Sequence, residues 1–173
     1  MRRGFTLVEL MVAMSIFIIV MTISMGSILG VFDANRKSRS LKIVLNNLNL
    51  AVESMSKEMR FGKNYHCGSG TVTVPQNCPG GDTLMSFLSS DNIQITYRLN
   101  NQTIEKKLDN GDYIAVTAPE IVIDNLTFYT VGAGASNTLQ PKVIIKIQSH
   151  AGLGADRSDF TLQTLVSQRV LDI

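Results

Sequence analysis

The sequence predicts an α+β fold in which one long N-terminal α-helix packs on a C-terminal antiparallel β-sheet. Three observations predict it. Residues 5–32 are almost free of charge, residues 41–59 repeat apolar side chains at spacings of three and four, and the chain beyond residue 82 alternates apolar and polar side chains. Since a sheet with one apolar face needs a second layer to cover it, the amphipathic part of the helix is expected to lie on that face.

The first segment, Phe5–Phe32, has the length and composition of a membrane-spanning helix. Glu9 is its one charged residue, and Arg2 and Arg3 precede the segment. About 20 apolar residues in a helix suffice to cross the hydrocarbon of a bilayer. An ordinary secretory signal peptide is one alternative, but it would have a shorter apolar core followed by a small-x-small cleavage site. A plain membrane anchor with an incidental glutamate is the other.

Glu9 is the informative residue of this segment. A carboxylate inside an apolar helix costs roughly 2.5–3.5 kcal/mol on insertion scales and usually marks a function. Glu9 lies one helical turn after Phe5. If the bond between Gly4 and Phe5 were cut, Phe5 would carry a free ammonium group that can pair with Glu9 of its own chain or of a neighbour. We therefore predict that Glu9 sets the register of an assembly.

The stretch Gly4-Phe5-Thr6-Leu7-Val8-Glu9, with its basic leader and long apolar run, resembles the type IV prepilin signal of type IV pilins and type II secretion pseudopilins. The resemblance implies that a membrane-bound prepilin peptidase cleaves between Gly4 and Phe5 and methylates the new N-terminus on Phe5. Glu9 is then the acid of the motif.

The resemblance also implies an order of parts and a set of partners. Residues 1–4 would form the cleaved leader, residues 5–32 the membrane-spanning and filament-core helix, and residues 33–173 a periplasmic or extracellular head. The chain would be a single-pass protein of the inner (cytoplasmic) membrane with its head outside, and later part of a pilus or pseudopilus filament. Its partners would be the prepilin peptidase, other pilin or pseudopilin subunits, the inner-membrane assembly platform and, before assembly, membrane lipid.

Charge around the apolar segment does not by itself fix its orientation. Arg2 and Arg3 favour a cytoplasmic N-terminus by the positive-inside rule. Four basic residues just beyond the other end favour the opposite: Arg36, Lys37, Arg39 and Lys42. The family resemblance and the cysteine pair both place the head outside, and we adopt that orientation.

The overall charge gives no sign of a polyanionic partner. The 173 residues carry 16 basic and 14 acidic side chains, for a formal charge of +2. Loss of Arg2 and Arg3 with the leader leaves the mature chain without net charge. The apparent basicity is therefore a targeting feature, and we expect no nucleic-acid partner.

The two cysteines, Cys67 and Cys78, are close in sequence and flanked by turn residues. In an exported domain the expected state is one disulfide, which would stabilise the fold by roughly 2–3 kcal/mol. A zinc site is an alternative, but with only His66 nearby it lacks the usual four ligands. A pair of free thiols is the second alternative, because the oxidising compartment is itself inferred.

The head is expected to begin with an amphipathic helix over residues 33–61. Gly62 follows the last apolar position closely and suits a helix stop. One apolar stripe runs along the second half of this helix: Leu41, Val44, Leu48, Val52, Met55 and Met59.

Residues 62–82 are expected to form a loop that contains the disulfide, because glycine and proline are frequent there. The β-sheet is expected to occupy residues 83–173. Ile93, Ile95, Tyr97 and Leu99 alternate with polar residues, and Asn100-Asn101 can turn the chain into a second strand over 103–108. Further strands are expected near 113–117, 121–131, 142–148 and 159–169.

No grouping of residues that would support catalysis stands out, so we expect no enzyme activity, no cofactor and no bound metal. His66 and His150 belong to no recognisable motif. The segments Asp109–Asp112 and Asp156–Asp159 could bind calcium, as some members of the pilin family do, but neither has the full spacing of an EF-hand and turn chemistry is favoured.

These features together predict a structural minor pilin or pseudopilin. The Phe160–Arg169 end and the strand before it look similar to minor subunits of the PilW or GspJ kind. The alternative is a filament-tip subunit that binds DNA, a surface or a secreted substrate. For DNA, the one sequence hint is Lys106-Lys107 beside Tyr97. A type IV pilus, a type II secretion system and a competence system remain equally open from the sequence.

Overall fold

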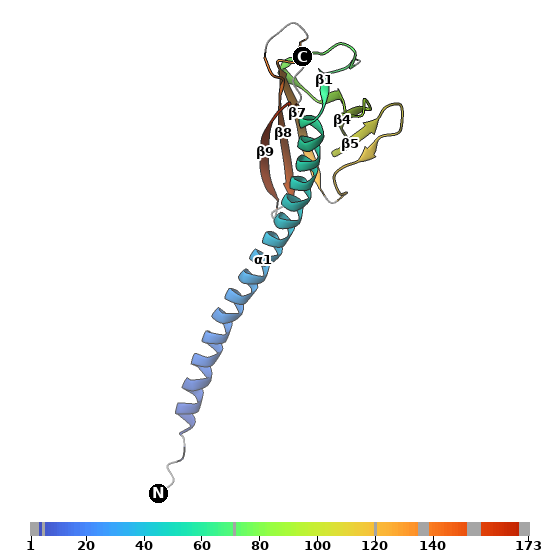
Figure 1. Ribbon diagram of the computed structural model, residues 1–173. Coiled ribbons are helices and arrows are strands. Elements are labelled where there is room, and N and C mark those ends of the chain that lie inside the picture. Colours follow the sequence, from blue (N-terminus) through green and yellow to red (C-terminus); the bar gives the residue numbers. More distant parts are fainter. Residues whose placement is uncertain are drawn as a thin grey trace. The chain divides into compact units, whose positions relative to one another are not determined.

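A computed structural model describes Gly4 and residues 6–70, 72–119, 121–134, 139–151 and 157–169 (Figure 1). The chain divides into two compact units, Met1–Ser40 and Leu41–Ile173, which are described one at a time. The first contains the beginning of helix α1, which runs over Leu7–Arg60, and the second contains the rest of α1 and all strands. The predicted α+β class, with one long N-terminal helix before antiparallel sheet, is confirmed.

Every described side chain in the first unit is exposed. This part of α1 therefore makes no hydrophobic core of its own. Its apolar side chains are about half to three-quarters exposed, from 75% at Leu7 to 51% at Ile28. Such a surface needs an apolar environment that the chain itself does not supply.

The part of α1 in the second unit buries one stripe of side chains. The stripe predicted from the sequence is confirmed from Val44 onward, whereas Leu41 is only partly covered. Ala51 is buried as well and also belongs to it. The buried stripe consists of Val44, Leu48, Ala51, Val52, Met55 and Met59.

The C-terminus of α1 is held by hydrogen bonds to its last carbonyl groups. The Met59 carbonyl accepts from the Gly62 amide at 3.0 Å and also from the hydroxyl of Tyr65. The Arg60 carbonyl accepts from the amide of Arg169 at 2.8 Å. These groups would be unsatisfied at a free helix end, so the contacts fix where the helix stops.

The first of two antiparallel sheets, sheet A, has the strand order β1-β3-β4-β5-β6. The predicted hairpin at Asn100-Asn101 is confirmed, with Asn100 paired to Thr103 across a turn in which Asn101 and Gln102 both have positive φ. The strands of sheet A are β1 (Lys63–Cys67), β3 (Leu84–Leu88), β4 (Gln94–Asn100), β5 (Thr103–Leu108) and β6 (Ile114–Ala115).

Sheet B has the order β2-β7-β8-β9, and three of its strands are ten residues long. The strands predicted near 121–131, 142–148 and 159–169 are confirmed as β7, β8 and β9, which lie next to one another in Figure 1. The strands of sheet B are β2 (Cys78–Asp82), β7 (Val122–Val131), β8 (Lys142–Ala151) and β9 (Ser158–Ser167).

Two details differ from the sequence prediction. The strands form two sheets rather than one, and the segment 62–82, expected to be a loop, contains the edge strands β1 and β2. Both strands pair irregularly, with a shift of register inside each. Asn64 and Gly81 have positive φ at these irregularities. Bulged edge strands do not alternate apolar and polar residues, so the period that marks a regular strand is missing from the sequence.

A disulfide joins the two sheets. Cys67 ends β1 in sheet A and Cys78 begins β2 in sheet B, with their Cα atoms 5.7 Å apart. A link that closes about a dozen residues stabilises a fold by about 3 kcal/mol in the chain-entropy account. Here it also fixes the edge of one sheet to the edge of the other.

The hydrophobic core of the second unit is one contiguous cluster. It brings the buried stripe of α1 together with inward side chains of both sheets, among them Phe87 of β3, Tyr97 of β4 and Phe128 of β7, all fully buried. Tyr65, Phe87 and Tyr97 follow one another with ring centroids 6.0 and 6.3 Å apart. The helix therefore provides the second layer that the sheets need.

Gly62 generates a stability prediction. A Cβ at this position would lie 2.5 Å from Cδ2 of Phe87, whose ring is fully buried and cannot withdraw. We expect Gly62→Ala to reduce the free energy of unfolding by about 1–3 kcal/mol, the usual cost of overpacking. Chemical denaturation of the full chain in detergent measures it. Gly80→Ala is the matched control, since nothing lies within 4 Å of a Cβ there. Equal stability of the two variants would contradict the proposed packing.

Candidate functional sites

The N-terminus of α1 is closed by a reciprocal pair of side chains, Thr6 and Glu9. Oε2 of Glu9 accepts from the backbone amide of Thr6 at 3.0 Å and from its hydroxyl at 2.9 Å. The hydroxyl of Thr6 in turn accepts from the Glu9 amide at 3.3 Å. This is a capping box, in which the first residue before a helix and the third residue within it satisfy each other's backbone groups.

The capping box identifies a role for Thr6 that the sequence analysis missed. The signal was present, because a threonine three residues before a glutamate at the start of an apolar run is the usual pattern. The carboxylate of Glu9 uses Oε2 for both contacts, and within the described residues Oε1 accepts no hydrogen bond. Among the residues that the structure describes, nothing therefore occupies the second oxygen of Glu9, and it can accept from a further donor.

Beyond the capping box, the hydroxyl groups inside the apolar segment are satisfied by the helix itself. Each donates to the carbonyl four residues before it, at 2.8–3.2 Å. Because lipid offers no partner to a polar group, this arrangement removes the cost of placing these residues in a bilayer. The four residues are Ser15, Thr22, Ser24 and Ser27.

By length and composition, α1 qualifies as a membrane-spanning helix. An 18-residue window within it reaches a mean hydropathy of 2.4, and none of that window is buried. Among the predicted processing residues, Gly4 is exposed, with nothing within 4 Å of a Cβ added to it. Phe5 lies outside the described residues. The cleavage, the methylation and the intersubunit role of Glu9 stay predictions.

In the second unit, Glu58 of α1 connects the helix to sheet A. Its carboxylate accepts from the hydroxyl of Tyr97 at 2.7 Å and from Nζ of Lys106 at 2.6 Å. Burial, together with the neighbouring Glu58 carboxylate, raises the pKa of Tyr97 far above its usual value.

The contacts of Glu58 overturn the sequence hint of a nucleic-acid surface. Tyr97 is fully buried and cannot stack on a base, and Lys106 is engaged by Glu58. Lys107 instead lies 5.4 Å from the ring centroid of Tyr113. The basic and aromatic residues of this hairpin therefore serve the fold.

A second group of charges covers the β4–β5 hairpin. Glu105 accepts from the side-chain amide of Asn100 at 3.2 Å and from Nε of Arg98 at 2.9 Å. These hydrogen bonds, that of Asn100 first, lower the pKa of the Glu105 carboxyl. Arg98 also stacks 3.4 Å from the ring centroid of Tyr113, so each member of the group has a partner.

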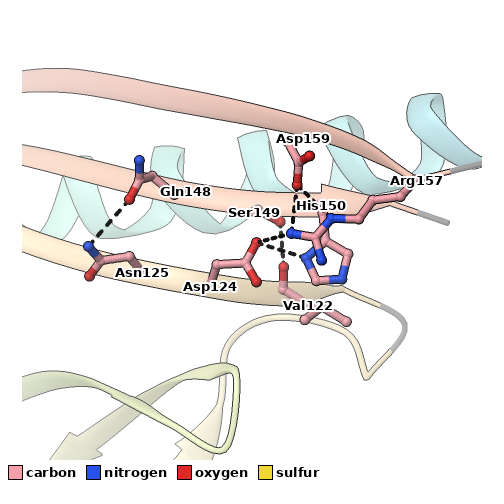
Figure 2. A network of polar contacts seen from close by, with 8 residues as sticks. All are labelled: Val122, Asp124, Asn125, Gln148, Ser149, His150, Arg157 and Asp159. Carbon is pink, nitrogen blue, oxygen red and sulfur yellow. Dashed lines mark hydrogen bonds and ion pairs between the residues drawn. The ribbon is translucent and has the colours of Figure 1, made fainter. Parts of the chain in front are cut away.

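Figure 2 shows a third group at one end of sheet B, where β7, β8 and β9 each contribute a side chain. Asp124 of β7 lies 2.7 Å from Nδ1 of His150 on β8. Arg157 reaches Asp159 of β9 at 2.7 Å and Asp124 at 3.7 Å. The Asp159 carboxylate is the main cause that raises the pKa of Arg157.

This group gathers three side chains of the kind that bind metals, which the sequence analysis did not bring together. Ligand atoms of Asp124, His150 and Asp159 lie within 4.8 Å of one another. Arg157 of the chain itself is a cation that contacts both carboxylates, so the group has an internal counter-charge, and we assign no metal. Asp156, part of one predicted calcium segment, lies outside the described residues.

The other predicted calcium segment is a turn. Oδ1 of Asp109 accepts from the amide of Gln94 at 2.8 Å, and the Gly111 amide donates to the Leu108 carbonyl at 2.9 Å. These contacts use the Asp109 side chain to close the turn after β5. The positions of the polar residues in Asp109–Asp112 are therefore explained by a turn, without a bound calcium ion.

His66 of β1 is a buried histidine, only 4% exposed. Its Nδ1 donates to the carbonyl of Val74 at 2.6 Å, and its ring fills the space where Gly70 would carry a Cβ. With Cys67 and Cys78 joined in a disulfide, no thiolate is left in this region for zinc. His66 therefore packs the segment that links β1 to β2.

The exposed apolar helix with its capped start, followed by two antiparallel sheets, defines an α+β protein of pilin-like architecture. Residues 1–25 match the family model of the prokaryotic N-terminal methylation motif. That motif is the signal of type IV pilins and pseudopilins, so this part of the sequence interpretation is confirmed. Comparisons with curated proteins and with solved structures found no match.

The contact between Tyr97 and Glu58 generates a prediction. Tyr97→Phe removes one buried hydrogen bond to a carboxylate, and we expect the free energy of unfolding to fall by about 2 kcal/mol. Since the folded pKa of Tyr97 is raised, its stabilising contribution is complete below pH ~10, the ordinary pKa of tyrosine, and is lost as the pH rises further.

Denaturation of the full chain at neutral and alkaline pH measures both effects. Tyr113→Phe is the control, because its ring stays to face Arg98 and its hydroxyl makes no hydrogen bond within the described residues. A Tyr97→Phe variant as stable as this control at neutral pH would contradict the role given to Glu58.

Proposed function

We propose that this chain is a minor pilin or pseudopilin. In this proposal it is made as a precursor in the inner membrane, with the head outside. Prepilin peptidase cleaves it between Gly4 and Phe5 and methylates Phe5. The mature chain then enters a type IV pilus or type II secretion pseudopilus through its apolar helix. The methylation motif at residues 1–25 is the observation that carries the proposal.

The exposed apolar surface of α1 supports a filament-core role. A membrane and a bundle of like helices both satisfy this surface, because lipid tails are about as apolar as leucine side chains. The hydrophobic gain on leaving the membrane is therefore small. Close packing and charge pairing must decide the register of one subunit against the next.

Glu9 can supply that register. In the single chain the capping box holds its carboxylate at the helix start, with Oε1 directed at no group within the described residues. The methylated ammonium of Phe5 from an adjacent subunit would complete the coordination of this oxygen. An acid that is costly alone in lipid becomes favourable once that cation arrives.

The disulfide between Cys67 and Cys78 supports the outside location of the head. Disulfides persist in exported proteins and are rare in the cytosol. Nothing in the head resembles a catalytic arrangement among the described residues, and the methylation signal indicates a structural subunit rather than an enzyme.

A filament-tip subunit that binds a surface or a secreted substrate is the alternative within this class. One feature favours it, a hollow of about 480 Å³ beside the last turns of α1. Phe61, Ile93 and Leu108 line it and are each more than a third exposed. DNA is not favoured as its ligand, because Tyr97 is buried and Lys106 is paired with Glu58.

Mass spectrometry of the mature N-terminus tests the processing step. In cells that contain prepilin peptidase, we expect the chain to lose Met1–Gly4 and to gain one methyl group on the amine of Phe5. Cells that lack the peptidase provide the control and should retain Met1. Cleavage at another bond in cells with the peptidase would overturn the proposal.

The role of Glu9 is tested by separating its two interactions. Glu9→Gln removes the charge, whereas Thr6→Ala removes the hydroxyl contacts of the capping box and keeps the acid and the backbone amide contact. If Glu9 pairs with the amine of a neighbour, Glu9→Gln should lower incorporation into filaments at least tenfold and Thr6→Ala should change it little. Sheared filaments and membrane fractions are compared by immunoblot after the N-terminus of each variant is verified. If both variants lowered incorporation equally, Glu9 would act only as a helix cap, and the pairing with a neighbour's amine would be refuted.

A further inference from the structure

Three basic residues follow the apolar segment of α1 within one turn of helix. Arg36, Lys37 and Arg39 are all exposed, and we call them the basic collar. None of the three takes part in an ion pair within the described residues. Asp33 is the one acid close to them on the helix, so the segment keeps an excess of positive charge.

The distance from Glu9 to the collar matches the thickness of a membrane. Arg36 follows Glu9 by 27 residues. At 1.5 Å per residue this is about 40 Å, and a bilayer with its headgroups is ~40–45 Å thick. When Glu9 lies at one headgroup layer, the collar lies at the other, level with the lipid phosphates.

The arrangement of the collar around the helix favours lipid over a single protein face. With 3.6 residues per turn, the three side chains spread over about 160° of the circumference. To contact a neighbouring helix or an acidic protein patch, the basic side chains would need to lie in a narrow stripe on one face of the helix. Lipid headgroups surround a membrane-spanning helix, so they can contact side chains that are spread around it. Long basic side chains also bend along the helix to reach the phosphate layer.

We propose that the basic collar is a binding site for the phosphate groups of anionic phospholipids in the leaflet on the side of the head. The inference rests on the proposed function, because it requires the apolar helix to span the membrane. It adds a ligand for the unassembled subunit, and it means that entry into the filament must release these lipids. Each basic residue near an anionic membrane surface raises the association constant about fivefold.

The test uses the mature chain in nanodiscs that contain phosphatidylcholine and phosphatidylglycerol. Electron spin resonance of spin-labelled lipids measures the relative association of the two lipids with the protein. We expect at least about fivefold preference for phosphatidylglycerol, and less at high salt. The triple variant Arg36→Gln, Lys37→Gln, Arg39→Gln should lose most of this preference.

A matched variant controls for net charge. Lys57→Gln, Arg60→Gln, Lys142→Gln removes three exposed cations outside the first unit, none of which forms an ion pair within the described residues. It should keep the lipid preference. Equal loss in both triple variants, or no preference in the unchanged chain, would overturn the collar as a lipid site.

A second experiment separates this inference from the proposed function. Extraction of cell membranes with alkaline carbonate shows whether the chain spans the bilayer. A chain released by carbonate would refute the membrane anchor and the collar with it. A chain that stays in the membrane without preference for anionic lipid would refute the collar alone.

Discussion

The buried stripe of α1, from Val44 to Met59, is the contact on which the head depends. Each sheet has an apolar face that needs a second layer. The helix provides that layer, and its buried stripe forms one contiguous core with the side chains of both sheets. The disulfide between β1 and β2 and the hydrogen bonds at the end of α1 then hold the sheet edges and the helix end in place. Overpacking at Gly62 would disturb this layer directly, because the position lies against the ring of Phe87.

The same helix meets two different environments. Within the first unit its apolar side chains are exposed and its hydroxyl groups are satisfied by the helix's own carbonyls. This combination suits lipid and also suits a bundle of like helices, since neither offers hydrogen bonds. Under the proposed function, a subunit that leaves one environment for the other needs a surface that both accept. In that proposal, the specificity of assembly depends on the few charges that remain, at Glu9 and beyond the apolar end.

The charged groups of the head behave differently from those of the helix start. Glu58, Glu105 and Asp124 each have a basic or hydroxyl partner from the same chain, so they hold strands and helix together. Glu9 has a partner for one of its oxygens, and the basic collar has none within the described residues. Both Glu9 and the collar lie on the exposed helix, which is where contacts with other molecules are expected.

The sequence by itself determined the α+β class, the apolar segment, the stripe on α1 and the methylation motif. These depend on order along the chain: the length of an apolar run, a repeat of three and four, and a short stretch around Gly4. The regular strands β4, β5 and β7–β9 were predictable for the same reason, because their alternation is local.

Only the tertiary structure decided how the strands divide into two sheets and what the head's charges do. β1 and β2 are bulged edge strands built from turn residues, so no local period marks them. Asp124, His150 and Asp159 come together through strand register, and Tyr97 is buried against Glu58 from 39 residues away. Such contacts depend on which segments lie side by side. The packing of the helix stripe against both sheets determines this arrangement, and it cannot be read from local sequence.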